Sequence, residues 1–250
     1  MAGQLKPEFI RPDWPAPASV HAVATTRMGG VSKGQWASFN LATHVGDDSR
    51  AVRENRDRLR VALRLHAEPT WLEQVHGVTV AEPGSTASPA VADAIVCWPG
   101  DPPGVVMTAD CLPVIFCNEA GTLAAAAHAG WRGLAAGVLE ATTDALLRAG
   151  AAPSTLMAWI GPAIGAAAYE VGEDVRAAFL AADPAAVAGF TANASGRWQL
   201  DLPLLARQRL RGAGLQRVYG GDLCTATDPR RFFSHRRDGP CGRQATLIWL

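Results

Sequence analysis

The chain of 250 residues lacks several features that would place it in a broad functional class. Its formal net charge is zero, so no overall field draws it to nucleic acid or to an anionic membrane. No stretch has the roughly 18 uninterrupted apolar residues of a membrane span. The first residues carry acidic groups and prolines where a secretion signal has an apolar core. We therefore expect a cytoplasmic protein with no nucleic-acid or membrane partner.

Cysteine and histidine are scarce, and their spacing excludes further classes. The five cysteines are odd in number and form no Cys-x-x-Cys pair, which favours free thiols in a reducing compartment. The six histidines include no His-x-His pair and no His-Glu-x-x-His motif. A four-copper oxidase needs more histidines than this, many of them in His-x-His pairs, so the chain cannot assemble one.

What the chain has is enough apolar material for a sizeable core, at 48% of its residues. Strand-like and helix-like segments alternate throughout, which indicates an α/β or α+β fold. The best loop candidate, residues 82–89, is too short to mark a domain boundary. We therefore expect a single domain over residues 1–250.

An amphipathic helix is predicted over residues 49–65, capped by Asp48 or Ser49. Two polar residues, Asn55 and Arg56, fall on its apolar stripe, where they suggest either a site role or a side chain that extends out along the helix edge. The stripe consists of Val52, Leu59 and Leu63.

Three strands are predicted in the centre of the chain, over residues 104–109, 112–117 and 122–127, with turn chemistry at 118–121. If the last two strands pair around that four-residue turn, Cys111 lies opposite His128, with Cβ atoms ~4.5–5.5 Å apart. Pro113 suggests an edge strand or a bulge in this region.

The next segment, His128 to Gly133 (HAGWRG), predicts a strand end, a glycine-flanked turn and then a helix over about 134–148. Free N–H groups at that helix start, together with Arg132, favour an anion such as phosphate. The glycine spacing matches neither a Walker loop nor a dinucleotide fingerprint.

His76, Cys111 and His128 are the candidate metal ligands. Two imidazoles and a thiolate can bind one zinc ion and leave its fourth position open, as in catalytic zinc sites. Copper is a chemically acceptable substitute at such a site. Cys111 and His128 also suit a thiol hydrolase, which needs an orienting Asn or Asp, whereas His76 favours the metal.

The sequence resembles the YfiH or "laccase-domain" family of purine nucleoside phosphorylases from about Ala24 to Leu250. The resemblance implies a four-layer α/β/β/α fold, similar to the catalytic domain of cytotoxic necrotizing factor, and zinc held by His76, Cys111 and His128. It rests on segments in order along the chain: TTRMGGVS (25–32), FNLATHVGDD (39–48), NRDRL (55–59), QVHG (74–77), TADCLPV (108–114), HAGWRG (128–133), IGPAIG (160–165), YEVG (169–172), LDL (200–202), CT (224–225) and FFSHRRDG (232–239).

The resemblance also implies phosphorolysis of adenosine, inosine and methylthioadenosine, with adenosine deamination as a second activity. Two departures lie near the C-terminus, where His235 and Cys241 replace the family's usual Tyr and Thr. Other functions remain open for the same residues: hydrolysis of an amide bond in cell-wall muropeptide precursors, oxidation of polyphenols at a single copper, and a non-catalytic binding module.

The candidate catalytic residues are His76, Cys111, His128 and Asp110, the last as a proton carrier or as an orienting group. Cationic side chains must hold the phosphate. The candidates for it are Arg27, Arg56 and Arg132. Weaker candidates for substrate hydrogen bonds are Asn40, His44 and Gln74. The expected partners are a nucleoside and phosphate, and a monomer is favoured over an oligomer.

Overall fold

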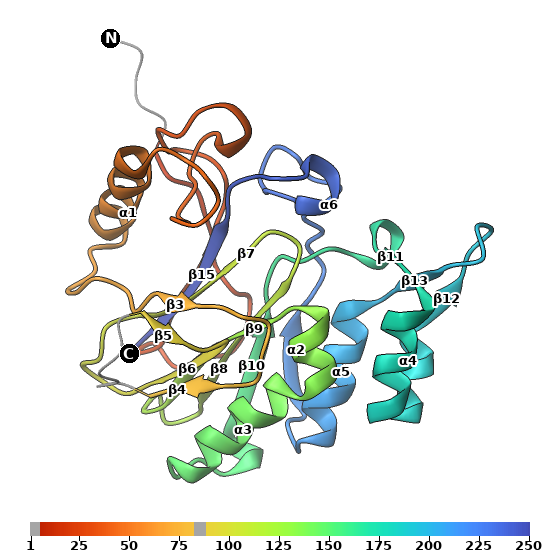
Figure 1. Cartoon of the computed structure of the whole chain (residues 1–250). Helices are drawn as coiled ribbons and strands as arrows, with labels where there is room; N and C mark the ends of the chain where they lie inside the picture. Colours follow the sequence, from red (N-terminus) through yellow and green to blue (C-terminus); the bar gives the residue numbers. More distant parts are fainter. Residues whose placement is uncertain (1–5, 83–88) are drawn as a thin grey trace.

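The computed structural model describes residues 6–82 and 89–250 (Figure 1). The predicted loop at 82–89 lies almost entirely outside the described residues. Within the described part, no helix is both long enough and apolar enough to cross a membrane.

Two sheets form the centre of the molecule. The first has the order β1-β2-β15-β7 and is antiparallel throughout. Its strands are β1 (Phe9–Ile10), β2 (His21–Thr25), β15 (Gln244–Trp249) and β7 (Gly104–Thr108). The second is mixed and has the order β14-β10-β8-β9-β6-β4. Its strands are β14 (Arg217–Gly220), β10 (Leu156–Ile160), β8 (Leu112–Asn118), β9 (Ala124–Ala129), β6 (Ala94–Cys97) and β4 (Val80–Ala81).

Alternation along β9 shows how the layers stack. Ala124 and Ala126 pack against the first sheet, whereas Ala125 and Ala127 pack against helices on the other side. These helices are α2 (Trp131–Ala136), α3 (Val138–Arg148) and α5 (Leu202–Gly212). The outer face of the first sheet is covered by α1 (Ser49–Leu63) and the loop before it. Figure 1 shows α1 and the group of α2, α3 and α5 at opposite sides of the sheets.

This arrangement confirms the predicted α/β class and its α/β/β/α layers; the likeness to cytotoxic necrotizing factor stays a prediction. The smaller elements are β3 (Leu72–Glu73), β5 (Ala90–Val91), β11 (Glu170–Val171), α4 (Glu173–Ala182), β12 (Phe190–Ala192), β13 (Trp198–Leu200) and α6 (His235–Asp238).

The predicted register of the β8–β9 hairpin is wrong by two residues. His128 lies opposite Pro113, and Cys111 precedes β8. The turn is longer than four residues because the Asn118 side chain organises it, accepting hydrogen bonds from the N–H groups of Thr122 and Leu123. Since side chains alternate with a period of two, a two-residue offset keeps each residue on its predicted face.

The helix that follows His128 also differs from its prediction. It begins at Trp131 and is interrupted at Gly137, whose φ of 101° separates α2 from α3. The predicted helix at 49–65 is confirmed with a slightly earlier end, and Asp48 caps it by accepting from the N–H of Arg50.

Candidate metal centre

The fold brings the three predicted ligands together. His76 lies in the loop between β3 and β4, Cys111 directly precedes β8, and His128 lies in β9. Their ligand atoms all lie within 4.8 Å of one another, and Cys111 Sγ is 3.7 Å from His76 Nε2. The two imidazole rings meet edge to face, with centroids 4.8 Å apart. Among the described residues, no other group of this kind could hold a metal ion.

Asp93, a fully buried residue just before β6, organises both histidines. Its carboxylate accepts hydrogen bonds from three successive N–H groups, those of Val75 (3.2 Å), His76 (2.9 Å) and Gly77 (2.6 Å). These bonds hold His76 at a φ of 62°, a left-handed conformation that costs energy for a side chain of this size. The same carboxylate lies 2.8 Å from His128 Nδ1, which must donate the proton. His128 Nε2 is thereby left free for a metal.

Sequence reasoning missed Asp93 and assigned the orienting role to Asp110. The available signal was a single acidic residue between Ala92 and Ala94, at the start of an apolar strand. A buried carboxylate in such a setting needs partners. Those partners lie 16 to 35 residues away in the chain, so they are visible only in the fold.

The residues present fit a tetrahedral metal ion. Zinc bound by nitrogen at ~2.0–2.1 Å and by sulfur at ~2.3 Å separates those two ligands by roughly 3.6 Å. The observed separation between His76 Nε2 and Cys111 Sγ is 3.7 Å. Gly130 leaves the necessary space, because a Cβ there would lie 2.6 Å from the His76 ring and 3.1 Å from the Cys111 sulfur. The donor set suits zinc and also admits copper.

The electrostatics favour a charged pair when no metal is bound. Burial opposes ionisation of the Cys111 thiol, but the charge of His128 and hydrogen bonds from both histidines lower its pKa to about 6. Burial likewise opposes the charged form of His128, while Cys111 and the hydrogen bond from Asp93 raise its pKa to about 9. At neutral pH the metal-free site therefore holds a thiolate beside an imidazolium.

Asp110 anchors distant segments beside Cys111. Its carboxylate accepts from Thr225 Oγ1 (2.6 Å) and from the N–H of Arg236 (2.7 Å), and its carbonyl accepts from the N–H of Ile164 (2.9 Å). Within the described residues, none of its hydrogen bonds reaches His76 or His128. Asp110 has a φ of 90°, so these bonds also stabilise a strained backbone.

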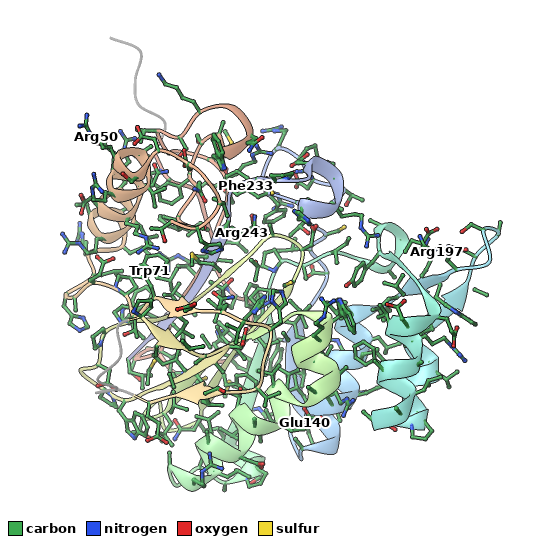
Figure 2. All side chains as sticks on the ribbon, in the orientation of Figure 1. Arg50, Trp71, Glu140, Arg197, Phe233 and Arg243 are labelled. Carbon is green, nitrogen blue, oxygen red and sulfur yellow. The ribbon has the colours of Figure 1, made fainter. Side chains whose placement is uncertain are left out.

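Two cavities are lined by predicted site residues. A small one of about 170 Å³ includes Cys111 itself. Its lining consists of Ala109, Asp110, Cys111, Trp131, Ile164, Tyr169, Leu202, His235 and Arg236. A larger one of about 770 Å³ contains three predicted substrate residues, His44, Arg56 and Gln74. Trp71, labelled in Figure 2 between α1 and β3, forms a wall of the larger cavity.

Arg56 is fixed at the larger cavity. Its guanidinium lies 3.7 Å from the centroid of the Trp71 ring, and its Nε donates to the carbonyl of Leu41. Burial lowers its pKa to about 10, which leaves it charged at neutral pH. Among the described residues, no hydrogen bond or ion pair uses its two terminal nitrogens.

The chain is similar in sequence to a known protein family and to several proteins of named function. A family described as "Multi-copper polyphenol oxidoreductase laccase" matches residues 21–250. The purine nucleoside phosphorylase PA4543 of Pseudomonas aeruginosa is 53% identical over 247 residues, which cover 97% of this chain and 98% of that protein. The chain belongs to the YfiH, or laccase-domain, family. Purine nucleoside phosphorylase YfiH of Escherichia coli is 48% identical, with 97% and 99% covered.

Solved structures of the laccase-domain family have the same fold. Protein NMB0706 of Neisseria meningitidis matches with a TM-score of 0.91 and 47% identity, over 97% of this chain and 98% of that one. YlmD of Geobacillus stearothermophilus matches with a TM-score of 0.87 and 32% identity, over 96% and 95%. The family description mentions several coppers, but the described residues of this member offer one three-ligand group.

The remaining predicted substrate residues are dispersed. Arg27 stacks on Phe233, labelled in Figure 2, and donates to two backbone carbonyls, those of Ala37 and Pro229. Asn40 is fully buried, and both ends of its amide make two hydrogen bonds each to protein groups. Asn40 therefore presents no unused group to a substrate, and Arg27 keeps only one terminal nitrogen, Nη2, without a partner among the described residues.

Gln74 and Arg132 remain near the site. The Gln74 amide bonds in both directions to the backbone of Met107, which fixes the chain two residues before His76. Arg132 is exposed and lies over the ring of Trp131, 4.4 Å from its centroid. Of the two departures from the family pattern, His235 lines the small cavity, whereas Cys241 is buried.

Proposed function

We propose that this protein is a zinc-dependent purine nucleoside phosphorylase. The observation that carries the proposal is the set of His76, Cys111 and His128, oriented by Asp93 and situated next to a cavity. Two relatives, 53% and 48% identical over nearly the whole chain, are named purine nucleoside phosphorylases. When bound, zinc would act as a Lewis acid toward negative charge at its open position.

Phosphorolysis requires a site for the phosphate, and Arg56 is the best candidate. In this reaction a phosphate oxygen attacks C1′ of the ribose, and the purine leaves with the electrons of the glycosidic bond. Of the three predicted arginines, Arg27 is used by protein groups and Arg132 is exposed. Arg56 combines a fixed plane with two terminal nitrogens that no described protein group uses, which suits a bidentate contact with phosphate.

His44 and Gln74 complete the proposed phosphate and ribose side of the site, since both line the cavity of Arg56. Burial lowers the pKa of His44, and the charges of Arg243 and Arg56 lower it further. A neutral imidazole can donate one hydrogen bond and accept another, as a ribose hydroxyl requires. Adenosine deamination is proposed as a side activity in which water adds to C6 of the purine and the 6-amino group leaves as ammonia.

Amide hydrolysis is the second candidate, and one observation favours it. Cys111, His128 and Asp93 supply a nucleophile, a base and an orienting carboxylate, the arrangement of thiol hydrolases. A bound metal would occupy the same sulfur, so the thiolate route belongs to the metal-free protein, whereas a zinc-activated water would serve the metal-loaded protein. Incubation of metal-free protein with a UDP-linked muramoyl amino acid tests it by product mass. Polyphenol oxidation at a single copper remains the lesser alternative.

The test of the main proposal combines metal analysis with chromatography of adenosine, incubated with and without phosphate. We expect bound zinc, and adenine plus ribose 1-phosphate only when phosphate is present. His76→Ala should abolish this product, while His66→Ala, at an exposed histidine outside both cavities, should not. A zinc-loaded preparation that forms no ribose 1-phosphate would overturn the proposal.

A further inference from the structure

The small cavity beside Cys111 has the walls of a site for a flat aromatic ligand. Ile164 and Leu202 form apolar parts of its lining and are each only 1% exposed. Trp131 and Tyr169 contribute aromatic rings. Pockets that are mostly apolar, with a few placed polar groups, are typical of sites for small organic molecules.

Both aromatic walls are held in place before any ligand arrives. The guanidinium of Arg132 lies 4.4 Å from the centroid of the Trp131 ring, and that of Arg236 lies 5.1 Å from the Tyr169 ring. Arg236 is fixed in turn, because its backbone N–H donates to Asp110 and its guanidinium donates to the carbonyl of Glu170. A ligand therefore meets preorganised rings, which lowers the entropic cost of binding.

His235 lines this cavity, and one of its ring nitrogens has no partner among the described residues. Its Nδ1 lies 2.9 Å from the carbonyl oxygen of Gly239. A carbonyl oxygen only accepts, so Nδ1 carries a proton, and Nε2 is the acceptor of this tautomer. Asp110 supplies the carboxylate of the lining, and both of its oxygens already accept protein hydrogen bonds.

A purine base fits this cavity better than phosphate does. Apolar walls do not compensate a phosphate for its lost hydration, and the Asp110 carboxylate would repel it. The arginine in the lining, Arg236, already donates to the carbonyl of Glu170 and lies over the Tyr169 ring. The larger cavity is lined by Glu68 and Glu73, but also by Arg56, whose two terminal nitrogens have no partner among the described residues, so a cation for the phosphate lies there.

We propose that the cavity formed by Trp131, Tyr169, Ile164 and Leu202 is the nucleobase subsite, and that His235 Nε2 is a specificity-determining group for the 6-position of the purine. This inference rests on the proposed function. Adenine donates a hydrogen bond from its 6-amino group, which Nε2 accepts. Hypoxanthine has an oxygen at that position, and two acceptors then oppose each other. The subsite therefore prefers 6-aminopurines.

The test is calorimetric titration of the full-length zinc-loaded protein with the free bases adenine and hypoxanthine, in parallel with metal analysis of each variant. Wild-type protein should bind adenine more tightly. His235→Phe keeps the ring but removes the acceptor, so adenine affinity should fall about three- to tenfold and hypoxanthine affinity should not. His235→Gln retains an acceptor and should restore most of the preference. Tyr169→Ala should weaken both bases about tenfold or more. His66→Phe is the matched control and should change neither.

The subsite is refuted if wild-type protein binds neither base, or if His235→Phe leaves the ratio of the two affinities unchanged. It is equally refuted if Tyr169→Ala leaves both affinities unchanged with zinc still bound. These results would not depend on phosphorolysis. Conversely, bases that bind as expected to a protein that forms no ribose 1-phosphate would refute the proposed function and leave the subsite standing.

Discussion

Replacement of Asp93 by asparagine should weaken metal binding without removing a ligand. Asp93→Asn keeps the shape of the side chain but replaces one accepting oxygen with a donating NH₂ group. If this NH₂ faces His128, the imidazole must place its proton on Nε2, the nitrogen that a metal needs. If it faces the backbone instead, it meets the N–H groups of Val75, His76 and Gly77, and His76 loses its support.

Either orientation of the amide costs metal affinity. Loss of an orienting partner of this kind reduces affinity ~10–100-fold, equivalent to about 1.4–2.7 kcal/mol. We expect the dissociation constant for zinc to rise by that factor in competition with a chromophoric chelator. The metal-free variant should also unfold at lower urea concentration, because a buried charge-assisted hydrogen bond contributes about 1.5–3 kcal/mol.

Asp101→Asn is the matched control for this prediction. Asp101 follows β6 and accepts from the N–H of Trp98 in a turn, with no link to the metal ligands. Its substitution should leave zinc affinity within about twofold, by the usual independence of distant sites. Zinc affinity in Asp93→Asn equal to that of the control would refute the role assigned to Asp93.

Three further predictions concern the same site. In metal-free protein, alkylation of Cys111 by iodoacetamide should be lost as pH falls through about 6, because the thiolate is protonated there. If peptide mapping shows that the alkylation rate has its midpoint near pH 9, the role of His128 is contradicted. Arg56→Lys should raise the KM for phosphate about tenfold with a smaller effect on kcat, since lysine lacks the forked guanidinium and its stacking on Trp71. Arg58→Lys in the same helix is the control. An equal KM for phosphate in both variants would contradict the role of Arg56. Gly130→Ala should lower zinc stoichiometry in elemental analysis, because the added Cβ would meet the His76 ring. Gly212→Ala, at a position with open space around it, is the control and should bind zinc normally. Full zinc occupancy in Gly130→Ala would contradict the site geometry.

The sequence allowed the three ligands to be predicted because their residue types and their place in the family motifs carry the information. The pairing of β8 with β9 was predicted, but its register was not predictable, since the side chain of Asn118, and not the turn composition alone, determines the length of the turn. The break between α2 and α3 had a visible signal in Gly137, but a single glycine is also tolerated within a helix.

The two polar residues on the apolar face of α1 were harder to interpret from the sequence. Asn55 and Arg56 both suggested a site, and the structure separates them. Asn55 is fully buried and holds the preceding loop, accepting from the N–H of Val31 and donating to the carbonyl of Asn40, whereas Arg56 reaches a cavity. Their difference arises from partners 15 to 24 residues distant in the chain, which local pattern does not reveal.

X-ray absorption at the zinc edge tests the central claim most directly. For zinc-loaded protein the account predicts one sulfur ligand at ~2.3 Å and at least two nitrogen ligands at ~2.0–2.1 Å, with a further light atom in the open position. Cys111→Ser should remove the sulfur contribution. A spectrum without sulfur, or one with two or more sulfur ligands, would contradict a metal centre formed by His76, Cys111 and His128.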